Sequence, residues 1–202
     1  EHDGSKWTGT INKIIVGFDY TITGHAYKCT DCPEEPEVIV TTFAGSGNIG
    51  SNNGAGNEAS FSSPHLIDID YQGNLFIADR GNNQIRKISV DGLVTKYAGT
   101  GERETQNGNI ENASFDQPLG LLIDSNFNFY ITVRDGLLRE IKNDGIVSTY
   151  STGFNAPSGL SFNLNGEILL ADIYNNRIAS ISNDGTVKNF ITGLDKPYDV
   201  KV

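Results

Sequence analysis

Short apolar runs alternate with polar turn sequences along most of this chain. In its clearest stretch the runs are 66–69, 74–78, 84–90 and 93–97, separated by a D-x-x-G turn, an Asn-rich turn and a D-G turn. Turns of these kinds supply the positive-φ positions that β-hairpins require, and the apolar spacing typical of a helix is sustained nowhere. The pattern predicts four short antiparallel strands joined by hairpins.

The same order of runs and turns occurs three times. Each copy opens on a Phe-x-x-Pro sequence, at 61–64, 115–118 and 154–157. A repeat of about 40 residues made of short strands and tight turns is typical of propellers and solenoids. One four-stranded sheet cannot bury both faces alone, so we predict an all-β fold, a β-propeller of stacked four-stranded antiparallel blades. The predicted blade-like segments are 1–43, 61–97, 115–150 and 154–190.

These recurring residues resemble the NHL-repeat family of β-propellers. The resemblance rests on F-x-x-P, the D/N-x-x-G turn, G-N-L-F-I-A-D at 73–79, N-N-Q/R-I at 82–85 and 175–178, and T-x-Y/F-A-G-S/T-G. It covers roughly residues 38–202 and is weaker in the second copy, where Val133 replaces the Asp of the repeat. The resemblance also implies possible functions, because such propellers include RNA-binding members with a basic face, a lyase with zinc-bound histidines and lactonases with a Glu/Asn/Asp metal site.

The two ends of the chain match parts of one blade. Continuing from residue 202 to residue 1 places Gly4 nine positions after Pro197, the spacing found in complete copies. We therefore expect a last strand, 194–202, to complete the blade of 1–43 in this or a neighbouring copy, which makes 1–202 one unit of about four blade-equivalents. A closed ring, strand donation to the next copy and one unit of a longer tandem protein all satisfy this expectation. Because an open sheet edge invites another chain, assembly with other copies or tandem repeats is favoured.

Charge and composition narrow the classes of partner. Fifteen basic against 25 acidic residues give a net charge of −10, which repels phosphate backbones, so we predict no nucleic-acid partner. No apolar run approaches the ~18 residues of a membrane span, and none is predicted. The chain contains no Met, so we expect a processed product or a segment of a longer protein. We interpret the basic residues of the first copy as covering strand edges; they are Arg80, Arg86, Lys87 and Lys96.

Two local motifs bear on the compartment. Cys29 and Cys32 are the only cysteines, and no second Cys/His pair completes a zinc site. A local disulfide is favoured over free thiols; it implies an oxidising compartment, so we expect an extracellular or cell-surface location. Asn112 begins the only N-x-S/T sequon, where a glycan would agree with secretion, although chance also supplies such tripeptides.

The remaining polar residues do not predict catalytic chemistry. Aspartates and asparagines recur with the blade, which favours turn formation over metal binding, since Asx side chains bond neighbouring backbone groups. These positions are Asp79, Asp172, Asn82, Asn83, Asn175 and Asn176, with Asp70, Asp124 and Asn163 in the first hairpin. The histidines His2, His25 and His65 are scattered. We predict no catalytic residue, no metal and no cofactor.

Long loops are the remaining candidates for recognition. The connections at 45–60 and 99–114 carry matching Gly/Asn-rich insertions, and propeller geometry places them at the same end as the turns 80–83 and 173–176. Candidate binding residues at this end are Asn48, Asn53, Arg80, Asn82, Arg103, Asn107 and Tyr174.

The sequence thus favours a non-catalytic extracellular or cell-surface propeller module, a structural or interaction scaffold that assembles head-to-tail in a tandem or filament-like manner. Two alternatives stay open. One is a metal-dependent lyase or lactonase-type enzyme, and the other is an intracellular protein-binding NHL adaptor.

Overall fold

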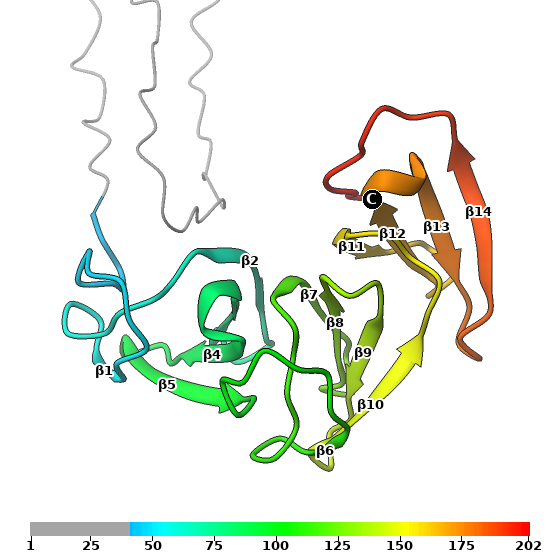
Figure 1. The fold of residues 1–202 in the computed structure, drawn as a ribbon. Coiled ribbons are helices and arrows are strands. Elements are labelled where there is room, and N and C mark those ends of the chain that lie inside the picture. The colour runs from blue at the N-terminus through cyan, green and yellow to red at the C-terminus, as the bar shows by residue number, and fades with distance from the viewer. Residues whose placement is uncertain (1–40) are drawn as a thin grey trace, which may run out of the picture.

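The computed structural model describes residues 41–202, which form three antiparallel sheets arranged side by side (Figure 1). Strands β2, β7 and β11 lie on the inside of this arrangement, and β5, β10 and β14 lie on the outside. The predicted fold class, an all-β propeller with antiparallel blades, is confirmed. Cys29 and Cys32, with the strands expected within 1–40, lie outside the described residues.

Each sheet contains four main strands in chain order. The first comprises β2 (Pro64–Ile69), β3 (Leu75–Asp79), β4 (Gln84–Ile88) and β5 (Leu93–Ala98). The second comprises β7 (Pro118–Ile123), β8 (Phe129–Val133), β9 (Leu138–Ile141) and β10 (Ile146–Ser151). The third comprises β11 (Pro157–Phe162), β12 (Ile168–Asp172), β13 (Arg177–Ile181) and β14 (Val187–Thr192). Short 3-10 turns, η1 (Arg80–Asn82) and η2 (Ile173–Asn175), follow β3 and β12.

Asx side chains shape the first hairpin of every copy. The Asp70 carboxylate accepts hydrogen bonds from the backbone N–H groups of Gln72 and Asn74, both at 2.9 Å. Asp124 and Asn163 accept equivalent pairs of backbone hydrogen bonds in the second and third copies. These contacts confirm the interpretation of Asp70, Asp124 and Asn163 as turn formers. Asp79 and Asp172 differ, because each carboxylate accepts from a backbone N–H 17 positions away and pairs with an arginine.

Aromatic side chains pack the sheets against one another. Between the first and second sheets, Phe76 lies 4.8 Å from Phe129, measured between ring centroids. Between the second and third, Tyr130 makes an edge-to-face contact with Phe162 at 6.0 Å. Edge-to-face pairs of this kind add stability beyond the area that they bury, so these rings hold neighbouring blades in place.

The two interblade insertions fold onto the outer edges of the sheets. β1 (Gly54–Ala55) pairs with β5, and β6 (Gly108–Asn109) pairs with β10, so each of these sheets gains a short fifth strand. The third copy has no such insertion, and its sheet has four strands.

A buried arginine binds each insertion. Arg86 is fully buried on β4 and donates hydrogen bonds to Ser60 O, Asn52 O and Asn53 Oδ1, at 3.0, 2.9 and 2.9 Å. The interpretation of Arg86 as covering a strand edge is therefore wrong. Its side chain lies beneath the insertion, and loop oxygens accept the hydrogen bonds that water would accept from an exposed arginine.

Arg139 on β9 makes the equivalent set of contacts. This second buried arginine donates to Ser114 O, Gln106 O and Asn107 Oδ1, at 3.0, 3.1 and 2.9 Å. Arg86 is paired with Ile77 of β3, and the equivalent pair in the third copy is Ala179 with Leu170. Ala179 therefore occupies the position of the buried arginine. The arginine and the insertion are thus present together in two copies and absent together from the third.

The C-terminal segment follows the inner side of the third sheet. The Gly159 N–H donates to Tyr198 O at 3.0 Å, and Lys196 N–H donates to Asn176 Oδ1 at 3.2 Å. Residues 194–202 contain no strand, which differs from the expected final strand. These residues nevertheless lie beside β11, where the inner strand of a following blade would lie. Completion of a blade by residues 1–43 stays a prediction, because nearly all of that segment lies outside the described residues.

Candidate binding pocket between the inner strands

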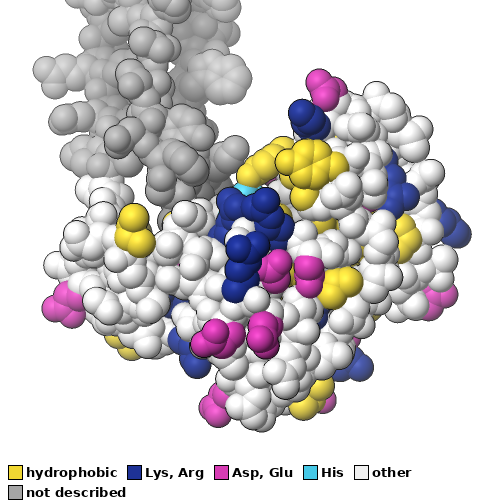
Figure 2. Space-filling view, in the orientation of Figure 1, with side chains coloured by type: hydrophobic (Ala, Val, Ile, Leu, Met, Phe, Trp, Pro, Cys, Tyr) yellow, Lys and Arg dark blue, Asp and Glu magenta, His cyan; other side chains and the backbone are white. Residues whose placement is uncertain are grey.

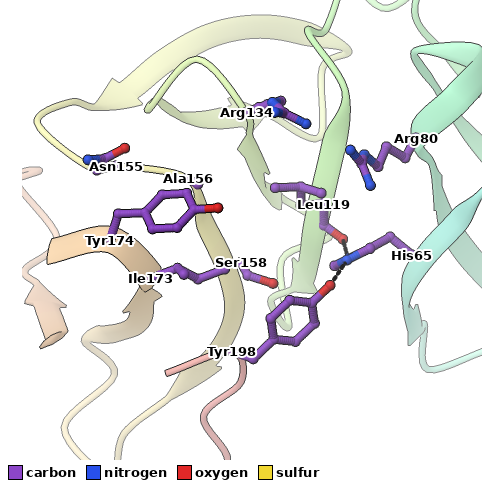
Figure 3. Close-up of a pocket in the computed structure, with 10 residues that line it drawn as sticks. All are labelled: His65, Arg80, Leu119, Arg134, Asn155, Ala156, Ser158, Ile173, Tyr174 and Tyr198. Atoms are coloured by element: carbon purple, nitrogen blue, oxygen red, sulfur yellow. Dashed lines mark hydrogen bonds between the residues drawn. The ribbon is translucent and has the colours of Figure 1, made fainter. Parts of the chain in front are cut away.

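Equivalent positions from four successive copies converge on one pocket. The residue that follows each repeat proline is His65 on β2, Leu119 on β7, Ser158 on β11 and Tyr198 in the C-terminal segment. All four line a cavity of about 320 Å³ (Figure 3). The cavity lies where the inner strands begin, so the fold itself brings these residues together.

A hydrogen bond between His65 and Tyr198 links the first and last of these copies across the pocket (Figure 3). His65 Nδ1 lies 3.0 Å from Leu119 O, and a carbonyl oxygen can only accept, so Nδ1 carries the proton and Nε2 accepts from the Tyr198 hydroxyl. Burial lowers the pKa of His65, and the Leu119 carbonyl opposes this effect. The imidazole is therefore neutral at pH 7.

Two arginines lie at the rim of the pocket. Arg80 and Arg134 directly follow β3 and β8, and both donate to Gln117 Oε1, at 3.1 Å from Arg80 Nη2 and 3.2 Å from Arg134 Nη1. Within residues 41–202 neither guanidinium is in an ion pair. In Figure 2 basic side chains gather beside the histidine, with apolar side chains on one side of them and acidic side chains on another. Two cationic groups therefore lie at the rim of the pocket although the whole chain is acidic.

The third copy contributes an apolar wall. Ile173 occupies the position equivalent to Arg80, and Tyr174 follows it on η2. Figure 3 shows both side chains across the pocket from His65. The pocket thus combines cationic, apolar and hydroxyl-bearing sides.

The predicted loop residues are divided between the pocket and structural roles. Arg80 and Tyr174 line the pocket. Asn53 and Asn107 bind the buried arginines, and Asn82 Nδ2 donates to Gly50 O and Asp79 Oδ2, both at 2.7 Å. The other two predicted residues lie on the surface: Arg103 pairs with Asp116 at 2.7 Å, and Asn48 is exposed.

Several pocket residues were not predicted from the sequence. They are His65, Arg134, Ser158 and Tyr198. A usable signal was present, because the position after each repeat proline carries a different residue in every copy, whereas the positions that maintain the fold recur.

Other site types receive no support from the described part of the chain. No group of three or more His, Cys, Asp and Glu side chains among residues 41–202 could hold a metal ion. Across the same residues, no helix has the length and apolar character to cross a membrane. Asn112, the sequon residue, is exposed in the second insertion.

Stacked antiparallel blades, with inner strands meeting at a shared pocket, define a β-propeller protein. Its repeats are of the NHL type. The chain is 29% identical over 185 residues to NHL repeat-containing protein 2 of Bos taurus, with 74% of this chain and 25% of that protein covered. The Homo sapiens protein of the same name is 30% identical over 168 residues, covering 67% and 23%. The resemblance to NHL-repeat propellers is therefore confirmed, and the chain spans about a quarter of these relatives.

Solved structures agree with the fold. Virginiamycin B lyase from Staphylococcus aureus is 26% identical, with a TM-score of 0.52 over 67% of this chain and 43% of that chain. An auxiliary nutrient binding protein from Bacteroides thetaiotaomicron is 17% identical, with a TM-score of 0.52 over 65% and 38%, and it shows the fold alone. No protein-family model matches the chain.

Proposed function

We propose that this chain is a non-catalytic propeller module that binds a ligand or partner at the pocket between its inner strands and serves as an interaction scaffold. The observation that carries the proposal is the set of side chains after the repeat prolines. In a repeat protein the residues that maintain the fold recur, whereas His65, Leu119, Ser158 and Tyr198 differ at one equivalent position and share one cavity. Concave sites with a few convergent polar groups are the usual places for ligand binding.

A ligand screen tests this proposal directly. ¹⁵N-labelled protein is titrated with a library of small polar molecules, and shifted amides are mapped onto the structure. We expect hits to perturb Leu119, Ser158 and their neighbours, and Tyr198→Ala to weaken them. Lys188→Gln, at an exposed position on β14, serves as the control variant. Hits that cluster elsewhere, or none at all, would contradict the proposal.

The proposal includes secretion and association with further copies. The exposed sequon at Asn112 supports a secretory route. The C-terminal segment supports strand exchange, because it occupies an inner-strand place beside β11 without being part of a described sheet. Light scattering during size-exclusion chromatography measures the mass of the assembly. A monomeric mass at all protein concentrations would argue against self-association.

A lyase-type activity is the second candidate, favoured by the neutral His65 in the pocket and by the similarity to virginiamycin B lyase. Metal analysis and an activity screen on lactones and cyclic peptides would distinguish it. Turnover that is lost in His65→Ala would replace the binding proposal with an enzymatic one. An intracellular adaptor role would be favoured if native material carried Asn112 unmodified.

A further inference from the structure

Two guanidinium groups at the pocket rim share a single neutral acceptor. Arg80 contacts Gln117 Oε1 through Nε at 3.3 Å and Nη2 at 3.1 Å, and Arg134 contacts the same oxygen through Nη1 at 3.2 Å. Each guanidinium has five N–H donors, so one amide oxygen leaves most of them without a partner among the described side chains.

The other arginines of the structured region differ in this respect. Three of the other four, Arg86, Arg103 and Arg177, each pair with a carboxylate, at 2.9, 2.7 and 2.8 Å. The fourth, Arg139, is buried and donates to carbonyl and amide oxygens of its insertion. Acidic residues outnumber basic ones in the whole chain by 25 to 15, so carboxylates are available. Two adjacent guanidiniums with no carboxylate partner therefore form a local positive site that suits an anion.

A second observation, independent of charge, lies deeper in the pocket. The Ser158 side chain is fully buried, and its Oγ has no hydrogen-bond partner among residues 41–202. Buried hydroxyls are nearly always hydrogen-bonded, so an orphaned hydroxyl on a pocket wall indicates a missing partner. Figure 3 shows this oxygen in the pocket beside Tyr198.

We infer that the pocket binds a small organic acid, with its carboxylate at Arg80 and Arg134, its apolar body against Ile173 and Tyr174, and a polar substituent at Ser158 Oγ. This inference rests on the proposed binding function and names the ligand class. Planar guanidinium groups match the geometry of a carboxylate, and the apolar wall favours an organic body over a bare oxyanion. The cavity of about 320 Å³ suits a small molecule.

Three probes separate the elements of the inference. 4-Hydroxybenzoate carries the carboxylate, an apolar ring and a hydroxyl, its methyl ester lacks the charge, and inorganic phosphate lacks the ring. In calorimetric and ¹⁵N-shift titrations at low salt, we expect saturable binding of 4-hydroxybenzoate that shifts Leu119 and Ser158. The ester and phosphate should each bind at least tenfold more weakly.

Matched variants test the residues. Arg80→Gln and Arg134→Gln should each weaken 4-hydroxybenzoate at least fivefold while leaving the ester unchanged, and Lys188→Gln should leave both unchanged. Arg134→Lys, which keeps the charge but loses the planar fork, should give an intermediate affinity. An unchanged amide spectrum outside the pocket shows that each variant is folded.

The outcomes distinguish a failure of this inference from a failure of the proposed binding function on which it rests. Equal binding of acid and ester in the pocket would overturn the carboxylate site and leave the binding function standing. Phosphate binding as tight as that of 4-hydroxybenzoate would overturn the assignment to an organic acid. If no probe and no library compound perturbs the pocket, both proposals fail.

Discussion

Arg86 donates a hydrogen bond to Asp79 at 2.9 Å, and neither side chain has any exposed surface. Asp79 also accepts from Ser62 N–H and Asn82 Nδ2, at 2.8 and 2.7 Å. The pair therefore connects β3, β4, the turn after β3 and the preceding insertion. In the second copy Val133 replaces the aspartate, and Arg139 binds its loop without a carboxylate.

This difference predicts that replacing the two arginines lowers the free energy of unfolding by unequal amounts. Arg86→Met leaves a buried carboxylate without its cation, and breaking such a pair costs about 3–5 kcal/mol. Arg139→Met loses loop hydrogen bonds but leaves no buried carboxylate behind, so it should cost less. Urea unfolding of both variants measures the difference. Equal losses would show that the Asp79 charge contributes nothing.

Each buried arginine should also stabilise its own insertion and not the other one. Arg86 contacts residues 52, 53 and 60, and Arg139 contacts residues 106, 107 and 114. Arg86→Met should therefore increase amide hydrogen exchange in 50–60 and leave 104–114 protected, and Arg139→Met should do the reverse. Exchange measured by mass spectrometry checks this. Loosening of both loops in either variant would contradict separate control.

Gly120 should tolerate no side chain. A Cβ at this position would lie 2.1 Å from Ser158 O, where β7 and β11 meet. We expect Gly120→Ala to cost about 3 kcal/mol, the upper end of overpacking effects, and to shift the Ser158 amide. Gly92→Ala is the comparison, because Gly92 has φ +81° and open space, so only about 1 kcal/mol of backbone strain is expected. A smaller loss for Gly120→Ala would be inconsistent with close contact of the inner strands.

His65 should make stability depend on pH. Burial lowers its pKa from the ordinary value of 6.5, and nearby Arg80 acts in the same direction, whereas the Leu119 carbonyl and Asp199 oppose. The unfolded chain therefore binds the proton more tightly, and stability falls as pH drops below 6.5 towards the folded-state pKa. His65→Gln should remove this component. Urea midpoints of both proteins between pH 7.5 and 5 measure it, and parallel curves would refute the assignment.

Asn112 should accept a glycan when the chain passes through a eukaryotic secretory pathway. The residue is exposed, and the neighbouring Ser114 Oγ accepts a hydrogen bond from Gln106 N–H at 3.0 Å. Treatment with an N-glycosidase should lower the mass of secreted protein, and Asn112→Gln should abolish the change. Secreted wild-type protein of unmodified mass would contradict the prediction.

The sequence predicted the blades because their turns are local. The residues that form a D-x-x-G hairpin are adjacent in the chain, so Asp70 and Gly73 identify the turn without tertiary information. Arg86 was misassigned because its partners Asn52 and Asn53 lie more than 30 positions away. A charge within a strand resembles a surface residue until the loop that covers it is placed.

The pocket was only partly predictable for a similar reason. Arg80 and Tyr174 could be identified because they lie in recognisable Asn-rich turns, just before the Asn pairs. His65 and Tyr198 are 133 positions apart and meet only when the inner strands converge. Neither residue carries a motif, so their relationship becomes visible only when the copies are superimposed position by position.

The insertions have a consequence for how this repeat can vary. Each insertion is hydrogen-bonded to an arginine of the blade that it precedes, and the aromatic contacts between blades involve other residues. A copy can therefore acquire or lose its extension through one sheet position and one connection, as Ala179 illustrates, while the aromatic contacts between blades are kept. The insertions that vary the surface and the aromatic rings that join the blades are in this way separate parts of the same repeat.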